Sequence, residues 1–227
     1  PTAIGQQGSG RIVVAGFGAA TSDQGHGAET ALLGLEETGV PDVNFSSGGA
    51  MGDGKCLRDW AYYSALIEGV QISDLAIEPG SDKLIVVGRG FDEATPTYAI
   101  AVQRMTSLCD RDAGFANSAG QLLYAFSDSS IPHEAHGVAL VPTLVSGVVV
   151  ASKIVVAGAV YETSSSSFDF GVLRLNPNGT SDSSFGGSGL GYRRIPWDMG
   201  DTSHDLGFDL ALQGDGKILI GGAVDTA

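Results

Sequence analysis

The chain has 227 residues, of which 17% are charged and 34 are glycine, and its formal net charge at pH 7 is −14. Such a composition is typical of a turn-rich β protein rather than of a disordered chain. The negative charge excludes nucleic acid as an expected partner and argues against binding to anionic membrane surfaces.

Short runs rich in Val and Ile and closed by Gly recur along the chain and predict strands. The four runs are Arg11–Gly16, Lys83–Gly88, Lys153–Gly158 and Lys217–Gly222. A Gly-rich turn directly precedes the first and the last of them. We therefore expect each run to be the second strand of a hairpin.

A third strand is predicted after each of the first three runs, and a fourth strand after a further turn. The third strands are expected at Thr30–Leu35, Ile100–Met105 and Phe170–Leu175, and the fourth at Lys55–Arg58, Gln121–Ala125 and Gly191–Ile195. Taken alone, Ala28–Glu37 has the Ala, Leu and Glu spacing of a helix. Its gapless counterparts have strand patterns, so the repeat predicts a strand there too.

An Asp-x-x-Phe motif lies in the turn between the third and fourth strands and returns every 70 residues. It is formed by Asp42 and Phe45, by Asp112 and Phe115, and by Asp182 and Phe185. Because the motif occurs in every unit, we interpret it as structural. The Phe is expected to be a plug between units, and the Asp to accept hydrogen bonds from N–H groups of the turn.

Four strands per unit, each joined to the next by a hairpin, describe a blade of a β-propeller. A β-solenoid is the alternative, but its repeats are usually much shorter. We therefore predict an all-β fold of propeller-like, four-stranded antiparallel units, about 3.5 in number, in a single domain over residues 1–227. The units are expected at about 1–72, 73–136 and 137–207, with a half unit at 208–227.

The stretch Val138–Val160 is mostly apolar, but Pro142, Gly147 and Lys153 lie within it. Its second half is the strand that recurs in the other units. We therefore predict two strands with a linker, and no membrane insertion.

The two cysteines, Cys56 and Cys109, fall near the outer end of one unit and in a late turn of the next. They either bridge neighbouring units in a disulfide or remain two small buried thiols. The sequence leaves both possibilities open.

Two clusters offer ligands for a metal ion. His133 and His136 are three residues apart in a predicted loop, and two loop imidazoles can hold a metal together with a third ligand. Asp198, Asp201 and Asp205, together with His204, form an acidic loop whose carboxylates suit Ca²⁺. Ordinary solvated side chains are the alternative for both clusters, and no other cofactor is expected.

The segment Phe168–Gly222 resembles the delta-60 repeat family of bacterial secreted and surface proteins. The similarity is carried by Arg174–Gly179 (RLNPNG), Asp182–Gly186 (DSSFG) and Leu210–Leu219 (LALQGDGKIL). The other units keep this pattern in a degenerate form. The resemblance implies a propeller-like protein that is extracellular or at the cell surface. It implies no catalytic residues, since the family has no assigned chemistry.

No set of residues typical of catalysis is apparent, so we expect a non-enzymatic scaffold or interaction module. Its expected partners are further copies of itself, through the incomplete last unit, or another surface protein. One alternative is a ligand- or metal-binding propeller with a site built from loops. In one form of this alternative the protein is a hydrolytic enzyme. A second alternative is a glycan-binding adhesin that uses Trp60, Tyr62 and Tyr63, which otherwise form a local hydrophobic cluster.

Overall fold

The computed structural model describes residues 1–18, 29–46, 53–58, 60, 67–92, 97–126, 132–197 and 204–225. These residues form fourteen β-strands, and no helix is present among them. The strands make three four-stranded sheets and one two-stranded sheet, and all pairs are antiparallel. The predicted all-β fold of propeller-like repeats is confirmed.

Each four-stranded sheet is one blade, and its strands follow one another in chain order from one edge to the other. The first blade contains β1 (Ala3–Gln6), β2 (Ile12–Gly18), β3 (Glu29–Leu35) and β4 (Lys55–Arg58). The second contains β5 (Ile67–Ile77), β6 (Leu84–Asp92), β7 (Thr97–Met105) and β8 (Gln121–Tyr124). The third contains β9 (His133–Val145), β10 (Val148–Glu162), β11 (Ser167–Leu175) and β12 (Tyr192–Ile195). A half blade of β13 (Asp205–Leu212) and β14 (Ile218–Val224) follows.

The later blades begin at Ile67, His133 and Asp205, a few residues before the predicted unit starts. The difference arises because the first strand of each blade continues on the N-terminal side of the segment that the repeat aligns. Within the segment whose composition favoured a helix, Glu29–Leu35 form the strand β3, which pairs with β2 along its whole length.

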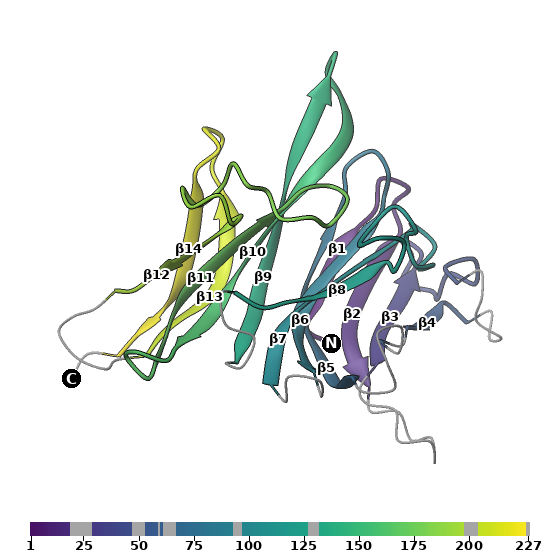
Figure 1. The fold of residues 1–227 in the computed structure, drawn as a ribbon. Coiled ribbons are helices and arrows are strands. Elements are labelled where there is room, and N and C mark those ends of the chain that lie inside the picture. The colour runs from purple at the N-terminus through teal and green to yellow at the C-terminus, as the bar shows by residue number, and fades with distance from the viewer. Residues whose placement is uncertain are drawn as a thin grey trace.

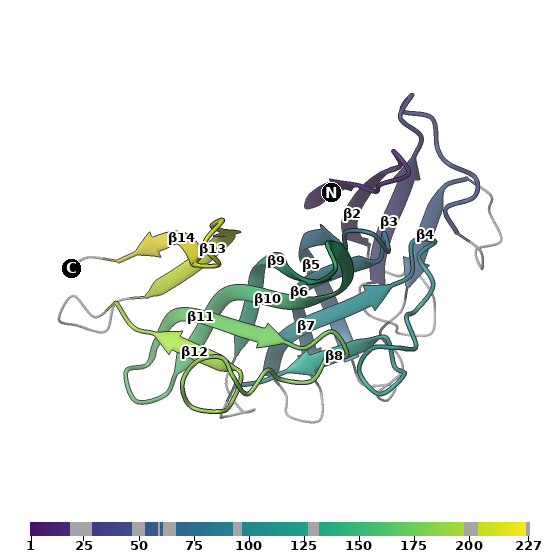
Figure 2. The same cartoon turned by 90° about the horizontal axis from the view of Figure 1, so that it is seen from above.

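The four sheets stand side by side in an open arc (Figures 1 and 2). The first strand of each later blade packs on the blade before it: β5 on β1 to β3, β9 on β5 to β7, and β13 on β9 to β11. In the view from above, the fourth strands β4, β8 and β12 lie on the outer side of the arc (Figure 2). The first strands therefore bring neighbouring blades together.

Equivalent residues of the blades build the core between them. Val13, Ile85 and Val155 hold the same position in β2, β6 and β10, and all three are buried. Each shares a hydrophobic cluster with one residue of the next blade's first strand, namely Leu75, Val138 and Leu210 respectively. The repeated pattern of apolar residues thus encodes one repeated contact between blades.

A β-bulge interrupts the first strand at the same place in the second, third and half blades. The bulged residues are Ser73, His136 and Phe208, and each lies beside a Gly of the paired strand. A Cβ atom on Gly88 or Gly158 would lie 1.9 Å from a carbonyl oxygen of the bulged strand, and one on Gly222 would lie 2.0 Å from it. The bulge therefore explains why the three runs that end at Gly88, Gly158 and Gly222 close with Gly.

Replacing Gly158 by Ala is expected to lower the stability of the fold, because the added methyl group would overlap the Glu134 carbonyl oxygen. We expect a loss of about 1–3 kcal/mol in the free energy of unfolding, measured by denaturant titration. Gly221 lies in the equivalent run, and a Cβ there would meet nothing within 4 Å. Gly221→Ala is the matched control, and an equal loss in both variants would contradict the role of the bulge.

The apolar stretch from Val138 onward forms two paired strands, as predicted, and they turn at Ser146 and Gly147. This β9–β10 hairpin projects beyond the other strands (Figure 1). Large apolar side chains are exposed near its tip, namely Leu144, Val145, Val148 and Val150. Within the described ranges, no helix is long and apolar enough to cross a membrane.

Candidate functional site

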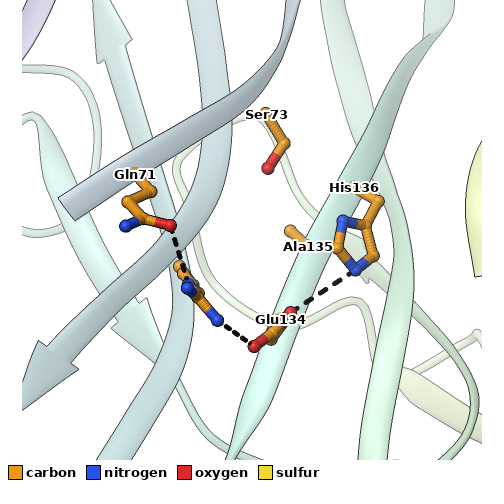
Figure 3. Close-up of a pocket in the computed structure, with 6 residues that line it drawn as sticks. Gln71, Ser73, Glu134, Ala135 and His136 are labelled. Carbon is orange, nitrogen blue, oxygen red and sulfur yellow. Dashed lines mark hydrogen bonds and ion pairs between the residues drawn. The ribbon is translucent and has the colours of Figure 1, made fainter. Parts of the chain in front are cut away.

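A pocket of about 230 Å³ lies between the second and third blades, on their inner strands. Its lining comes from β5, β6 and β9 and consists of Gln71, Ser73, Arg89, Glu134, Ala135 and His136. In Figure 3, Ser73 and Glu134 face the space between Gln71 and His136. Clefts at junctions between structural units are common places for ligand sites.

The bulges place two of these side chains in the pocket. A bulge adds one residue to a strand and re-aims the side chain at that position. Ser73 and His136 are the bulged residues of β5 and β9, and both line the pocket. The third bulged residue, Phe208 of β13, lies next to His136, with 6.0 Å between the ring centroids.

Arg89 connects the two blades across the pocket. Its Nε donates to Gln71 Oε1 at 3.0 Å, and its Nη1 donates to Glu134 Oε1 of the next blade. The guanidinium carbon also lies 4.8 Å from the centre of the Tyr98 ring. The hydrogen bonds and the ring contact together fix the orientation of the guanidinium group.

His136 completes the network on the β9 side. Its Nε2 lies 3.6 Å from Glu134 Oε2. Burial lowers the pKa of His136, and the positive charge of Arg89 adds to this effect, although Glu134 opposes it. The imidazole is therefore neutral at pH 7.

The structure places the predicted metal ligands in different surroundings. His133 is fully buried, with its ring 5.2 Å from the ring of Phe126, whereas His136 lines the pocket. His204 is exposed, and its Nδ1 accepts a hydrogen bond from the Phe168 N–H at 3.1 Å. Asp198 and Asp201 lie outside the described residues. Among the residues described, no group of three or more His, Cys, Asp or Glu side chains could hold a metal ion.

The structure describes only one residue, Trp60, of the aromatic cluster considered for glycan binding. Trp60 is buried in the core between the first two blades, and its indole N–H donates to Thr30 Oγ1 at 2.9 Å. It therefore offers no exposed ring to a ligand. Tyr62 and Tyr63 lie outside the described residues.

Each repeated Asp binds both the backbone of its turn and a positively charged side chain. In the three blades the carboxylate accepts a hydrogen bond from the N–H two residues later, that of Asn44, Gly114 or Ser184. It also pairs with an Arg whose guanidinium lies over the Phe of the same motif. These Arg–Phe pairs are Arg11 with Phe45, Arg104 with Phe115, and Arg174 with Phe185.

The first blade reaches the same arrangement from a different position. In the other two blades the Arg comes from the third strand, and a Lys adds a second ion pair, namely Lys83 directly before β6 and Lys153 within β10. In the first blade Gly34 takes the place of that Arg, and Arg11 stands where the others have Lys. A Cβ on Gly34 would lie 2.3 Å from the Phe45 ring, so Phe45 occupies that space.

Acid is expected to weaken the fold through these carboxylates. Burial alone would raise the pKa of Asp182, but hydrogen bonds from Lys153, Ser184 and Arg174 outweigh it and hold the pKa well below the usual 3.8. Since the folded-state pKa is depressed, this stabilisation is complete above pH 3.8 and is lost as the pH falls further toward the folded-state value.

Asp182→Asn is therefore expected to lower the stability at pH 7 by roughly 1–3 kcal/mol and to flatten its decline below pH 4. The measurement is the denaturation midpoint at a series of pH values. Asp215→Asn removes an exposed Asp–Lys pair in another turn and serves as the control, since such pairs contribute little. A pH profile of Asp182→Asn that parallels the wild type would contradict this assignment.

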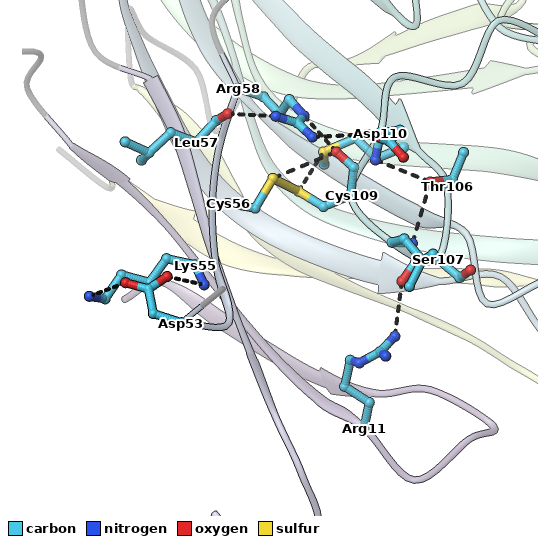
Figure 4. Close-up of a disulfide and its surroundings, with 12 residues drawn as sticks. Arg11, Asp53, Lys55, Cys56, Leu57, Arg58, Thr106, Ser107, Cys109 and Asp110 are labelled. Carbon is cyan, nitrogen blue, oxygen red and sulfur yellow. Dashed lines mark hydrogen bonds and ion pairs between the residues drawn. A yellow bond between two sulfur atoms is a disulfide. The ribbon is translucent and has the colours of Figure 1, made fainter. Parts of the chain in front are cut away.

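Cys56 and Cys109 form a disulfide between the first and second blades (Figure 4). Arg58 lies beside it, donates from Nε to the Cys109 carbonyl oxygen at 2.6 Å, and pairs with Asp110 at 3.1 Å. The covalent link and these contacts together fix the outer strand β4 on the neighbouring blade.

Residues 152–185 match the family model of a β-propeller domain of unknown function, DUF5122. The match covers most of β10, all of β11 and the Asp-x-x-Phe motif of the third blade. No curated protein matches the chain. The fold and the match together support a β-propeller repeat family.

The sequence analysis found only one of the polar pocket residues, His136. Arg89 and Gln71 were missed because no motif contains them, and Glu134 was missed because only the two histidines that flank it were considered as ligands. One available signal was the position after the run-ending Gly, where Arg89 stands and the other blades have Phe17, Ala159 or Ala223. A charged residue at a position that is otherwise apolar marks a departure from the scaffold.

Proposed function

We propose that this chain is a non-catalytic β-propeller-like scaffold, located outside the cell or at its surface, that associates with copies of itself through its two end faces. We further infer that its repeats are of the delta-60 type, on the basis of the motif in Arg174–Gly179 and Asp182–Gly186. The motif residues that recur in the blades are engaged in packing, turns and ion pairs, which supports a scaffold role.

The observation that carries the proposal is the exposure of blade-packing positions at both ends of the arc. Ile4 of β1 corresponds in register to Leu75, Val138 and Leu210, the residues that pack on a preceding blade. Those three are at most 8% exposed, whereas Ile4 is 69% exposed. The first blade thus presents the contact face that the other blades bury.

The half blade presents the opposite face. Leu219 of β14 corresponds to Val13, Ile85 and Val155, which are at most 1% exposed, yet Leu219 is 52% exposed. Phe185, the plug residue that faces the half blade, is also only partly buried. Within the described residues, β14 pairs with β13 alone, so its other edge is open to a further strand.

The two faces are complementary because each internal blade junction joins these same two positions. At each junction the two residues share one hydrophobic cluster, namely Leu75 with Val13, Val138 with Ile85, and Leu210 with Val155. Leu219 of one copy and Ile4 of the next would form the same contact between two chains. A head-to-tail contact of this kind is heterologous and forms a closed ring or an open filament.

The disulfide supports a location outside the cytoplasm, because such bonds persist mainly in oxidising compartments. The strongly negative net charge of −14 suits a soluble surface module and gives no support to nucleic acid as a partner.

Ile4→Asp is expected to reduce self-association, since it puts a charge on the first blade's open face. Ile4 is largely exposed, so the fold of the single chain should tolerate the change. Light scattering after size exclusion should give a mass well above 23.2 kDa for the wild type and close to 23.2 kDa for the variant.

Leu144→Asp is the matched control, because Leu144 is similarly exposed but lies near the tip of the β9–β10 hairpin, away from both end faces. This control should keep the wild-type mass. A wild type of 23.2 kDa at all concentrations, or dissociation by Leu144→Asp and not by Ile4→Asp, would refute association through the end faces.

A further inference from the structure

We propose that the pocket between the second and third blades binds a neutral sugar residue through its hydroxyl groups, with Arg89, Glu134, Ser73 and His136 as the polar contacts. This inference is independent of self-association, since it uses β5, β6 and β9 rather than the end faces.

The pocket offers both donors and acceptors within a small space. In the part of the chain that the structure describes, Arg89 donates from Nε and Nη1, which leaves the N–H groups of Nη2 for a ligand. The Ser73 hydroxyl and the Gln71 amide nitrogen add further donors. Glu134 Oε2 and the second imidazole nitrogen of His136 are acceptors. Hydroxyl groups, which both donate and accept, match such a mixed set.

The charges in the pocket cancel, which argues against an ionic ligand. Arg89 is paired with Glu134, so an anion would meet the carboxylate and a metal cation would meet the guanidinium. The net charge of −14 further disfavours an anion. A neutral, hydrogen-bonding ligand incurs neither repulsion.

The size and the rim of the pocket suit one sugar ring. At 230 Å³ the pocket is smaller than the range of about 300–1,000 Å³ that is usual for drug-sized ligands. Phe208 lies beside His136 and is 51% exposed, so its ring offers an apolar face at the edge of the polar pocket. Sugars combine an apolar C–H face with a rim of hydroxyl groups. The C–H face matches the Phe208 ring, and the hydroxyl groups match the polar side chains of the pocket.

The arrangement is preorganised rather than induced by a ligand. Gln71 and the Tyr98 ring hold Arg89, and Glu134 contacts both Arg89 and His136 (Figure 3). The bulges at Ser73 and His136 require Gly88 and Gly158 opposite them, so the backbone of the second strands supports both bulges. Fixed polar groups of this kind reduce the entropic cost of binding.

The test is a glycan array that carries neutral, acidic and amino-sugar glycans, followed by titration of the strongest neutral binder. We expect a neutral glycan to bind. Glu134→Gln keeps the shape and removes the charge, and it should weaken binding roughly tenfold or more. Ser73→Ala should weaken binding in the same direction. Ser73→Ala also separates lost binding from misfolding, because it leaves the Arg89–Glu134 ion pair between the blades intact.

Glu162→Gln is the matched control, since Glu162 pairs with Arg194 within the third blade and does not line the pocket. It should leave the affinity unchanged. The proposal is overturned if no neutral glycan binds, if acidic or amino-sugar glycans bind in preference, or if folded Glu134→Gln and Ser73→Ala proteins bind as the wild type does.

Discussion

Replacing Phe115 by Ala should cost about 3–5 kcal/mol in the free energy of unfolding, which is the usual range for emptying a buried aromatic site. Phe115 is fully buried in the cluster between the second and third blades. Its ring lies against Gly179 of the next blade, where a Cβ atom would come within 2.9 Å of it. The neighbouring Ala116 N–H also donates to the Asn178 carbonyl oxygen across the same junction at 2.9 Å.

The measurement is denaturant unfolding of Phe115→Ala beside Phe185→Ala. Phe185 holds the same motif position but is only partly buried, because just two strands follow it in the half blade. The second variant should therefore lose clearly less stability than the first. Equal losses would mean that the motif Phe acts within its own turn rather than between blades.

Removing the disulfide should have an effect of similar size. The bond joins cysteines separated by 53 residues and links the first two blades. The chain-entropy treatment of a loop of this length gives about 4 kcal/mol. For a chain of this size such a loss lowers the melting temperature by roughly 8–16 °C, which calorimetry of Cys56→Ser/Cys109→Ser protein would measure.

Reductant provides the internal control for the disulfide. It should destabilise the wild type and leave the double serine variant unchanged, since the variant has no further cysteine. A wild type whose melting temperature does not respond to reductant, under conditions where both thiols are shown to be free, would contradict the stabilising role of the bond.

The repeat made most of the fold predictable. The predicted strand at Lys55–Arg58 matches the bounds of β4, and the third strands lie within β3, β7 and β11. The prediction succeeded at β3 because alignment with the other units outweighed local helix propensity, which tertiary pairing overrides. The starts of the first strands were less predictable, because the bulges interrupt their alternating pattern.

The candidate site could be predicted only in small part. His136 was identified as a metal ligand in a loop, but it belongs to a strand and points into a pocket beside Arg89 and Glu134. Its proximity to Arg89 depends on how two blades pack, and these residues are 47 positions apart in the chain. The spacing of residues within a single unit cannot predict a contact between units. His136 is itself the bulged residue of β9, whereas His133 is paired with β10 and fully buried, so their close spacing did not place them in one site.

Head-to-tail association is tested most directly by disulfide trapping between an Ile4→Cys protein and a Leu219→Cys protein, mixed under mild oxidation. If the open face of the first blade docks on the half blade of another copy, these positions come together as Leu75 and Val13 do inside the chain. We expect a cross-linked dimer in the mixture, and its loss when excess wild-type protein competes. A yield no higher than that from Ile4→Cys mixed with Leu144→Cys would contradict head-to-tail association.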